Sequence, residues 1–187
     1  RMLAYSSIVH AGFILVGLQA TTDRGNSSVL AYLAVYALLT VGSFGVVTVV
    51  GGTGDSSHGL DSYRGLGRRR PFLAGTFTVL LLGQAGIPFT GGFVVKLGVL
   101  AAAVDMGTYW LAGVAMLAAA VAAFVYLRVL VAMYLKEAPT GSEVPGAVPV
   151  GALVVIIVSA ATVLLAGLVP GPLLDLARDA VPVLVVG

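Results

Sequence analysis

Five long apolar stretches constrain the fold of this chain more than any other feature. They cover residues 2–20, 29–50, 71–104, 109–134 and 148–169, and 59% of the sequence is hydrophobic whereas only 10% is charged. A helix needs about 20 apolar residues to cross a bilayer, and the stretches lack the alternation that marks membrane β-barrels. The sequence therefore predicts an all-α integral membrane protein with five transmembrane helices. They would form a single transmembrane domain over residues 1–187, with a short interfacial tail at 170–187.

The third stretch is too long for one straight helix. Over residues 71–104 a helix would measure about 51 Å at ~1.5 Å per residue, whereas the hydrocarbon core is about 30 Å thick. Pro88 lacks a backbone donor and clashes with the preceding turn, Ile87 before it is disfavoured in a helix, and Gly91 and Gly92 add backbone freedom. We therefore predict two half-helices, joined by a break that runs from Ile87 to Gly92.

Positive charges indicate how the chain crosses the membrane, because Lys and Arg concentrate in cytoplasmic loops. With five crossings, six of these charges fall on one side and two on the other. The six are Arg1, Arg64, Arg68, Arg69, Arg70 and Lys136, and the two are Arg24 and Arg178. We expect the first side to be cytoplasmic, so the C-terminus would lie outside. Because the chain begins with Arg1 and shows no signal-peptide pattern, we expect a fragment that starts at the edge of a membrane helix.

Several classes of site are excluded by composition. The absence of cysteine rules out disulfides, thiolate metal sites and iron–sulfur ligation within this chain. The net charge of +2 is too small to suggest a nucleic-acid partner. The stretch "GGTG" lacks the Lys-Ser/Thr of a phosphate-binding P-loop. We expect no cofactor and no metal ion to bind this chain.

Two ionisable side chains are expected near the centre of the membrane. His10 and Lys96 each lie about 12 Å along a helix from the nearer end of their stretch, whereas the acidic residues all fall in connections, at span edges or in the tail. A charge inside the bilayer is costly and indicates function. Lysine can release its proton, whereas arginine stays charged, and histidine titrates near neutral pH. The alternatives are a lysine that reaches the membrane surface and a histidine that only hydrogen-bonds a neighbouring helix.

Hydroxyl groups accompany these two residues. Ser6 and Ser7 lie one helical turn before His10, and Tyr32, Tyr36, Thr40 and Ser43 form a polar stripe on the second stretch. The candidates for lining a proton path are Ser6, Ser7, Tyr36, Thr40, Ser43 and, in the break, Thr90. Such a stripe more often serves helix–helix hydrogen bonding, and that alternative stays open. The fourth and fifth stretches have almost nothing polar at their centres, and we interpret them as scaffold.

Three segments carry a resemblance to a known family. They are "RMLAYSSIVHAGFILVGL", "YRGLGRRRPFLAGTFTVLLLGQAGIPFTGGFVVKLGVL" and "YWLAGVAMLAAAVAAFVYLRVLVAMY". Together they resemble the C-terminal part of an antiporter-like membrane subunit of proton-pumping NADH:quinone oxidoreductase, respiratory complex I. The lysine at position 96, together with "YSSI" and His10, favours the chain N type over the chain M type, which usually has a glutamate there.

The resemblance implies a subunit of about fourteen helices, of which these would be the last five. It also implies that Lys96 is central to the outer half of a proton channel and that His10 relays protons toward it. NADH, FMN, iron–sulfur clusters and quinone would bind other subunits of the complex, and the partners would be further membrane-arm subunits in a bacterial inner membrane. The alternative is a subunit of a multisubunit cation/proton antiporter without redox coupling.

Overall fold

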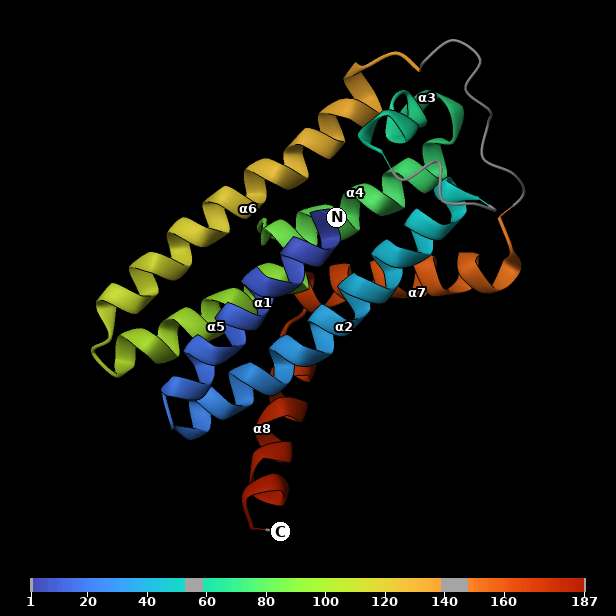
Figure 1. Ribbon diagram of the computed structural model, residues 1–187. Helices are drawn as coiled ribbons and strands as arrows, with labels where there is room; N and C mark the ends of the chain where they lie inside the picture. The colour runs from blue at the N-terminus through green and yellow to red at the C-terminus, as the bar shows by residue number, and fades with distance from the viewer. Residues whose placement is uncertain (1, 53–58, 139–147, 187) are drawn as a thin grey trace.

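The protein is a bundle of helices in the computed structural model, which describes residues 2–52, 59–138 and 148–186 (Figure 1). Arg1, which entered the charge count, lies outside this part. The long helices are α1 (Met2–Gln19), α2 (Asp23–Gly51), α4 (Pro71–Ala85), α5 (Gly91–Asp105), α6 (Tyr109–Leu135), α7 (Val150–Leu168) and α8 (Gly171–Val186). Two short elements, η1 (Leu60–Tyr63) and α3 (Leu66–Arg69), precede α4. The described residues contain no β-strand.

Four of the helices, α1, α2, α6 and α7, are each long and apolar enough to cross a membrane, and α4 is a shorter apolar helix. Large apolar side chains such as Trp110, Leu117 and Val121 are exposed on the outside of the bundle, as a lipid-facing surface requires. The prediction of an all-α membrane protein is therefore confirmed. That α4 and α5 together make a further crossing stays a prediction.

The helix break lies between α4 and α5, at residues 86–90. Gly86 ends α4 with a φ of 80°, and the N–H groups of Gly86 and Ile87 donate to the carbonyls of Gly83 and Leu82 at 3.0 Å each. This arrangement is the Schellman motif, which favours glycine. The side-chain oxygen of Thr90 then accepts the N–H of Phe93 at 3.4 Å and begins α5. Because Thr90 caps the helix, Gly91 belongs to α5 and the break ends earlier than the sequence predicted.

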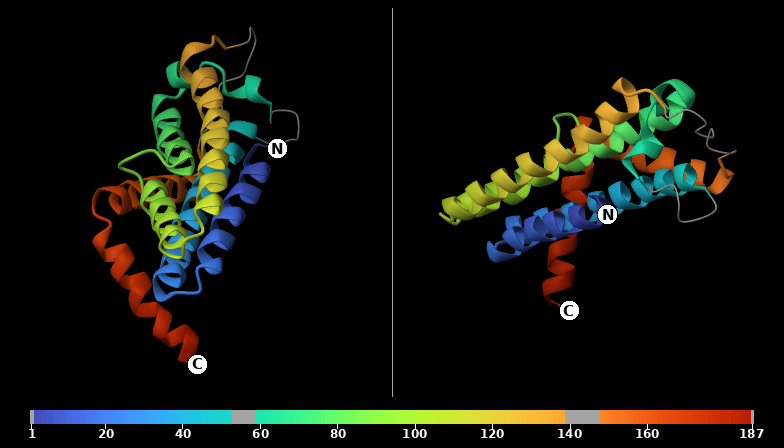
Figure 2. Two further views of the ribbon diagram at one scale, coloured as in Figure 1. Left: turned by 90° about the vertical axis from the view of Figure 1, so that its left-hand side faces the viewer. Right: turned by 45° about the horizontal axis from the view of Figure 1, so that its top comes forward.

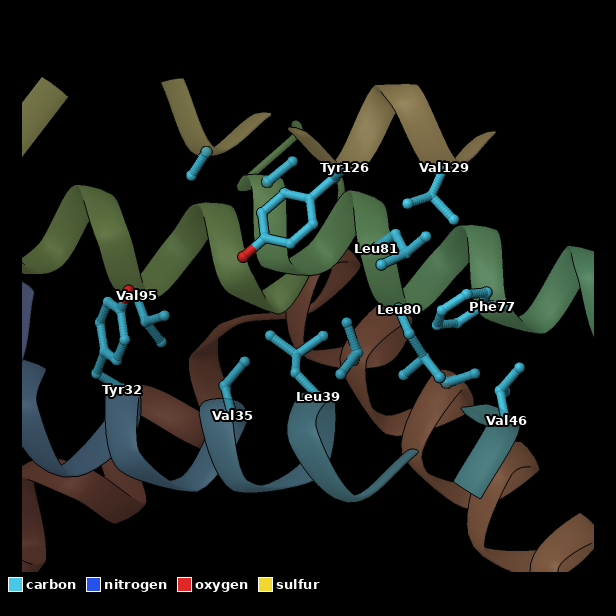
Figure 3. Close-up of a cluster of buried hydrophobic side chains, with 14 of the residues drawn as sticks. Tyr32, Val35, Leu39, Val46, Phe77, Leu80, Leu81, Val95, Tyr126 and Val129 are labelled. Atoms are coloured by element: carbon cyan, nitrogen blue, oxygen red, sulfur yellow. The ribbon is translucent and has the colours of Figure 1, made fainter. Parts of the chain in front are cut away.

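Helix α2 is the central element, since it packs against α1, α4, α5, α7 and α8. Figure 3 shows Tyr32, Val35 and Leu39 projecting from α2 toward α4 and α5, and Tyr126 projecting from α6 into the same layer. The side chain of Thr22 accepts the N–H of Gly25 at 3.1 Å, so α2 begins at Asp23, before the apolar stretch. The ionisable residues on α1 and α5 therefore lie beside the same central helix.

The C-terminal part of the chain is helical. Helix α8 turns away from α7, crosses α2 and projects beyond the bundle at its C-terminal end (Figures 1 and 2), with Ala177 and Val181 buried. The predicted position of residues 170–187 at the membrane interface stays a prediction.

Candidate functional site

Lys96 is buried at the helix break, with only 6% of its surface exposed. Its Nζ donates to the carbonyl oxygens of Gln84 at 2.7 Å and Ala85 at 3.0 Å. These carbonyls belong to the last turn of α4 and take no part in the Schellman motif. A helix C-terminus carries partial negative charge and attracts cations. The end of α4 therefore provides a binding site for an ammonium group, and the Lys96 side chain is buried inside the bundle.

Gly86 shapes this binding site. A Cβ atom at position 86 would lie 2.8 Å from Cδ of Lys96, and the φ of 80° is a conformation that other residues rarely adopt. The lysine side chain therefore passes directly over the backbone of the break. Across the described ranges Lys96 makes no ion pair with a carboxylate.

His10 belongs to α1 and its side chain packs against α2, with 2% of its surface exposed. Its Nδ1 is 2.8 Å from the hydroxyl of Tyr32, and its ring stacks on Tyr36 with centroids 4.3 Å apart. The space lined by these three side chains is too small to admit a water molecule. Among the described residues, the hydrogen bond to Tyr32 is the polar side-chain contact through which His10 can exchange a proton in this conformation.

Phe13 connects Lys96 to the hydrogen-bonded pair of His10 and Tyr32. The Nζ of Lys96 lies over the Phe13 ring, 5.3 Å from its centroid. The same ring is nearly parallel to that of Tyr32, with an interplanar angle of 15° and centroids 6.0 Å apart. Lys96, Phe13, Tyr32 and His10 thus form a continuous series of contacts across α5, α1 and α2.

Gln84 is the centre of a second group of contacts, which we call the Gln84 network: Ser6, Ser43, Gln84 and Tyr126. The Gln84 side chain is 1% exposed; it accepts from Ser6 at 3.3 Å and donates to Ser43 at 2.7 Å. The hydroxyls of Ser6 and Tyr126 are also hydrogen-bonded. The network joins α1, α2, α4 and α6, and the backbone oxygen of its central residue holds Lys96.

The remaining candidates lie apart from these groups. Ser7 is exposed and donates to the carbonyl of Leu3 at 3.2 Å. Thr40 is half-buried, and no hydrogen bond of its side chain occurs within the described ranges. Thr90 caps α5 and also donates to the carbonyl of Ile87 at 2.7 Å, so it shapes the break. The structure therefore brings together Ser6, His10, Tyr36, Ser43 and Lys96, but not Ser7 or Thr40.

The sequence analysis had no role for Phe13 or Tyr126, and Gln84, part of a weak polar stripe on the third stretch, was not among the site candidates. Tyr126 lies on the span interpreted as scaffold, and its position as a tyrosine in the interior of that span, away from the tyrosines at its two ends, was the available signal. Gln84 is likewise an amide in an apolar helix, two residues before the break. Phe13 carried no signal, because its contact with Lys96 depends on how α1 and α5 pack. No group of three or more potential metal ligands occurs in the part of the chain that the structure describes.

The chain matches the family model described as NADH:quinone oxidoreductase/Mrp antiporter, transmembrane, over residues 1–122. It is 48% identical to NADH-quinone oxidoreductase subunit N 3 of Streptomyces griseus, covering 96% of this chain and 32% of that protein. It is 46% identical to NADH-quinone oxidoreductase subunit N of Acidothermus cellulolyticus, covering 98% and 36%. The chain therefore spans about a third of the length of these relatives.

Two solved structures have a similar fold. A chain of respiratory complex I from Thermus thermophilus with bound aureothin aligns with a TM-score of 0.79 at 31% identity, covering 92% of this chain and 38% of that chain. A chain of the Mrp complex from Dietzia sp. aligns with a TM-score of 0.80 at 20% identity, covering 95% and 41%. At 20% identity, the similarity to the Mrp chain shows a shared fold and nothing further.

Proposed function

Because the chain belongs to the NADH:quinone oxidoreductase/Mrp antiporter transmembrane family, we propose that it forms part of a proton-translocating membrane subunit of NADH:quinone oxidoreductase. It contributes the outer half of a proton channel. The observation that carries this proposal is the buried ammonium of Lys96, which is held by the end of a broken helix without a carboxylate partner in the described ranges. Discontinuous helices commonly build ion sites in transporters.

In this proposal Lys96 alternates between charged and neutral forms. The carbonyls of Gln84 and Ala85 stabilise the charged form, and release of the proton toward the outer side follows when the ammonium leaves them. His10 relays protons to this region through its hydrogen bond with Tyr32. Ser6, Tyr36 and Ser43 keep their place as candidates for the proton path. Thr90 shapes the break, and Ser7 and Thr40 need a different conformation to take part.

The chain itself performs no redox chemistry in this proposal. NADH, FMN, iron–sulfur clusters and quinone bind partner subunits, and quinone reduction there drives the charge changes. The test is to purify the full-length protein from its own membrane through an affinity tag. We expect flavin and iron–sulfur subunits to co-purify, together with NADH-driven proton pumping after reconstitution into vesicles.

The alternative is a cation/proton antiporter subunit without redox coupling. The similar fold of a chain of the Mrp complex is compatible with this alternative. Its signature in the same purification is a set of membrane subunits without flavin or iron. The relatives at 46–48% identity are NADH-quinone oxidoreductase subunits, which favours the redox-coupled function. Recovery of membrane subunits alone, with Na⁺-dependent or K⁺-dependent proton exchange, would replace our proposal with the alternative.

The proposed topology has five crossings of a bacterial inner membrane, with α4 and α5 making one of them and the C-terminus outside. It can be tested by single-cysteine labelling, because the chain has no native cysteine. We expect Met106→Cys, at the exposed end of α5, to react with a membrane-impermeant maleimide added to intact cells. Lys136→Cys, at the exposed end of α6, should react only after the membrane is opened. The reverse pattern would invert the topology.

A further inference from the structure

In the part of the chain that the structure describes, Lys96 has no counter-ion of the kind that usually accompanies a buried charge. Buried charges in proteins are normally paired or coordinate metals, yet within the described residues the ammonium contacts two carbonyls and one aromatic ring. The aromatic ring is that of Phe13, which is 2% exposed. A cation over an aromatic face is attracted by the quadrupole of the ring, and the attraction is strongest where water is excluded.

We propose that Phe13 is a positioning residue for proton transfer at Lys96. Its ring holds the charged ammonium at the end of α4, in place of a carboxylate. This inference rests on the proposed function and adds a residue from α1 to the lysine site. Because a neutral amine is not attracted to the ring in the same way, the contact distinguishes the two protonation states of Lys96. A carboxylate in the same place would hold the charged form much more strongly and would oppose release of the proton.

The placement of Phe13 also links the two ionisable residues. Phe13 lies one helical turn after His10 on α1, and its ring stacks on Tyr32, which is hydrogen-bonded to His10. A movement of Lys96 away from the ring therefore changes the packing of the ring that supports the Tyr32–His10 hydrogen bond. By this route the charge on Lys96 changes the geometry of the Tyr32–His10 hydrogen bond, through which the proposal brings protons toward the lysine.

The test compares substitutions that keep the ring face with substitutions that remove it. In the full-length protein within the assembled complex, we expect Phe13→Leu to lower the rate of NADH-driven acidification of inverted vesicles by roughly threefold to tenfold. That range lies between the roughly twofold to fivefold effect of an exposed cation–π contact and the roughly thirtyfold effect of a desolvated one. Phe13→Tyr keeps the ring face, and we expect it to stay within about twofold of the wild type. Rates are normalised to the amount of assembled complex on native gels.

A matched control comes from α4. Phe77 is 1% exposed and stacks on Tyr63 with centroids 5.7 Å apart, and it lies about two helical turns before the end of α4. Phe77→Leu removes a buried ring of the same size without touching the lysine, so we expect normal acidification per assembled complex. If Phe13→Leu reduces assembly, Phe13→Met provides a flexible side chain of similar volume that also lacks a ring face.

Each outcome decides the inference. Wild-type acidification in Phe13→Leu, a loss in Phe77→Leu as large as that in Phe13→Leu, or a Phe13→Tyr variant no better than Phe13→Leu would each overturn it. These results are distinguishable from failure of the proposed function. Normal acidification in Lys96→Ala would remove the proposed function itself, whereas loss in Lys96→Ala with normal Phe13→Leu would remove only the role of Phe13.

Discussion

If the proposed function holds, we expect vesicles that contain Lys96→Ala in the assembled complex to lose NADH-driven proton pumping through this subunit, with acidification reduced by at least about tenfold. A factor of ten corresponds to about 1.4 kcal/mol in the barrier. The physical reason is that alanine leaves the carbonyls of Gln84 and Ala85 without their cation and leaves no group at the break that can carry a proton. The measurement is the initial quench of a pH-sensitive dye after NADH is added.

Lys96→Arg tests whether the side chain at position 96 must release its proton or need only carry a positive charge. Arginine keeps the positive charge but does not give up its proton in proteins, so we expect pumping to be lost in this variant as well. Lys136→Ala is the matched control, because Lys136 is an exposed lysine just after α6, and it should pump normally. Pumping that survives in Lys96→Arg but not in Lys96→Ala would contradict the deprotonation step.

Gly92→Ala is expected to prevent assembly of the subunit. A Cβ atom at position 92 would overlap the carbonyl oxygen of Gly83, because the first turn of α5 packs directly on the end of α4. Overpacking a tight contact typically costs about 1–3 kcal/mol, and we expect the upper end because a backbone atom cannot rotate away. The amount of full-length subunit in the assembled complex, measured on native gels, should fall sharply.

The control for this change is Gly113→Ala on α6, where no atom lies within 4 Å of the added Cβ. Alanine replaces glycine favourably in an unstrained helix, by about 0.5–1 kcal/mol, so assembly should be unchanged or slightly improved. Equal assembly of Gly92→Ala and Gly113→Ala would show that the close approach of α5 to α4 is not required.

The helix break was predictable because its causes are local. Pro88, the glycines and the excess length of the stretch all appear in the sequence, and the structure places the break between Ala85 and Gly91. Its end was misplaced because the cap formed by Thr90 was not considered. The cap at Thr22, which starts α2 at Asp23, was missed for the same reason.

The contacts of the site were harder to predict, because they join residues far apart in the chain. Ser6 and Tyr126 are hydrogen-bonded although 120 positions separate them, and the face that α6 presents to α1 cannot be read from an apolar span. Burial of Lys96 was expected from its depth, but its binding to main-chain carbonyls was not. Ser7 shows the opposite error, since helical spacing suggested a shared face and packing left it on the surface.

The partners of Lys96 on α4 are main-chain atoms, so substitutions of side chains on α4 cannot remove them. Substituting the side chain of Gln84 or Ala85 leaves both carbonyl oxygens in place, so Lys96 does not require a particular residue type at either position. The constraint moves instead to Gly86, which the lysine side chain passes over, and to Gly92, which lets α5 pack on the end of α4. A comparison of related sequences that looks for an acid co-varying with this lysine would therefore miss its main-chain partners. Invariant glycines at these positions would be the expected sign of the lysine site.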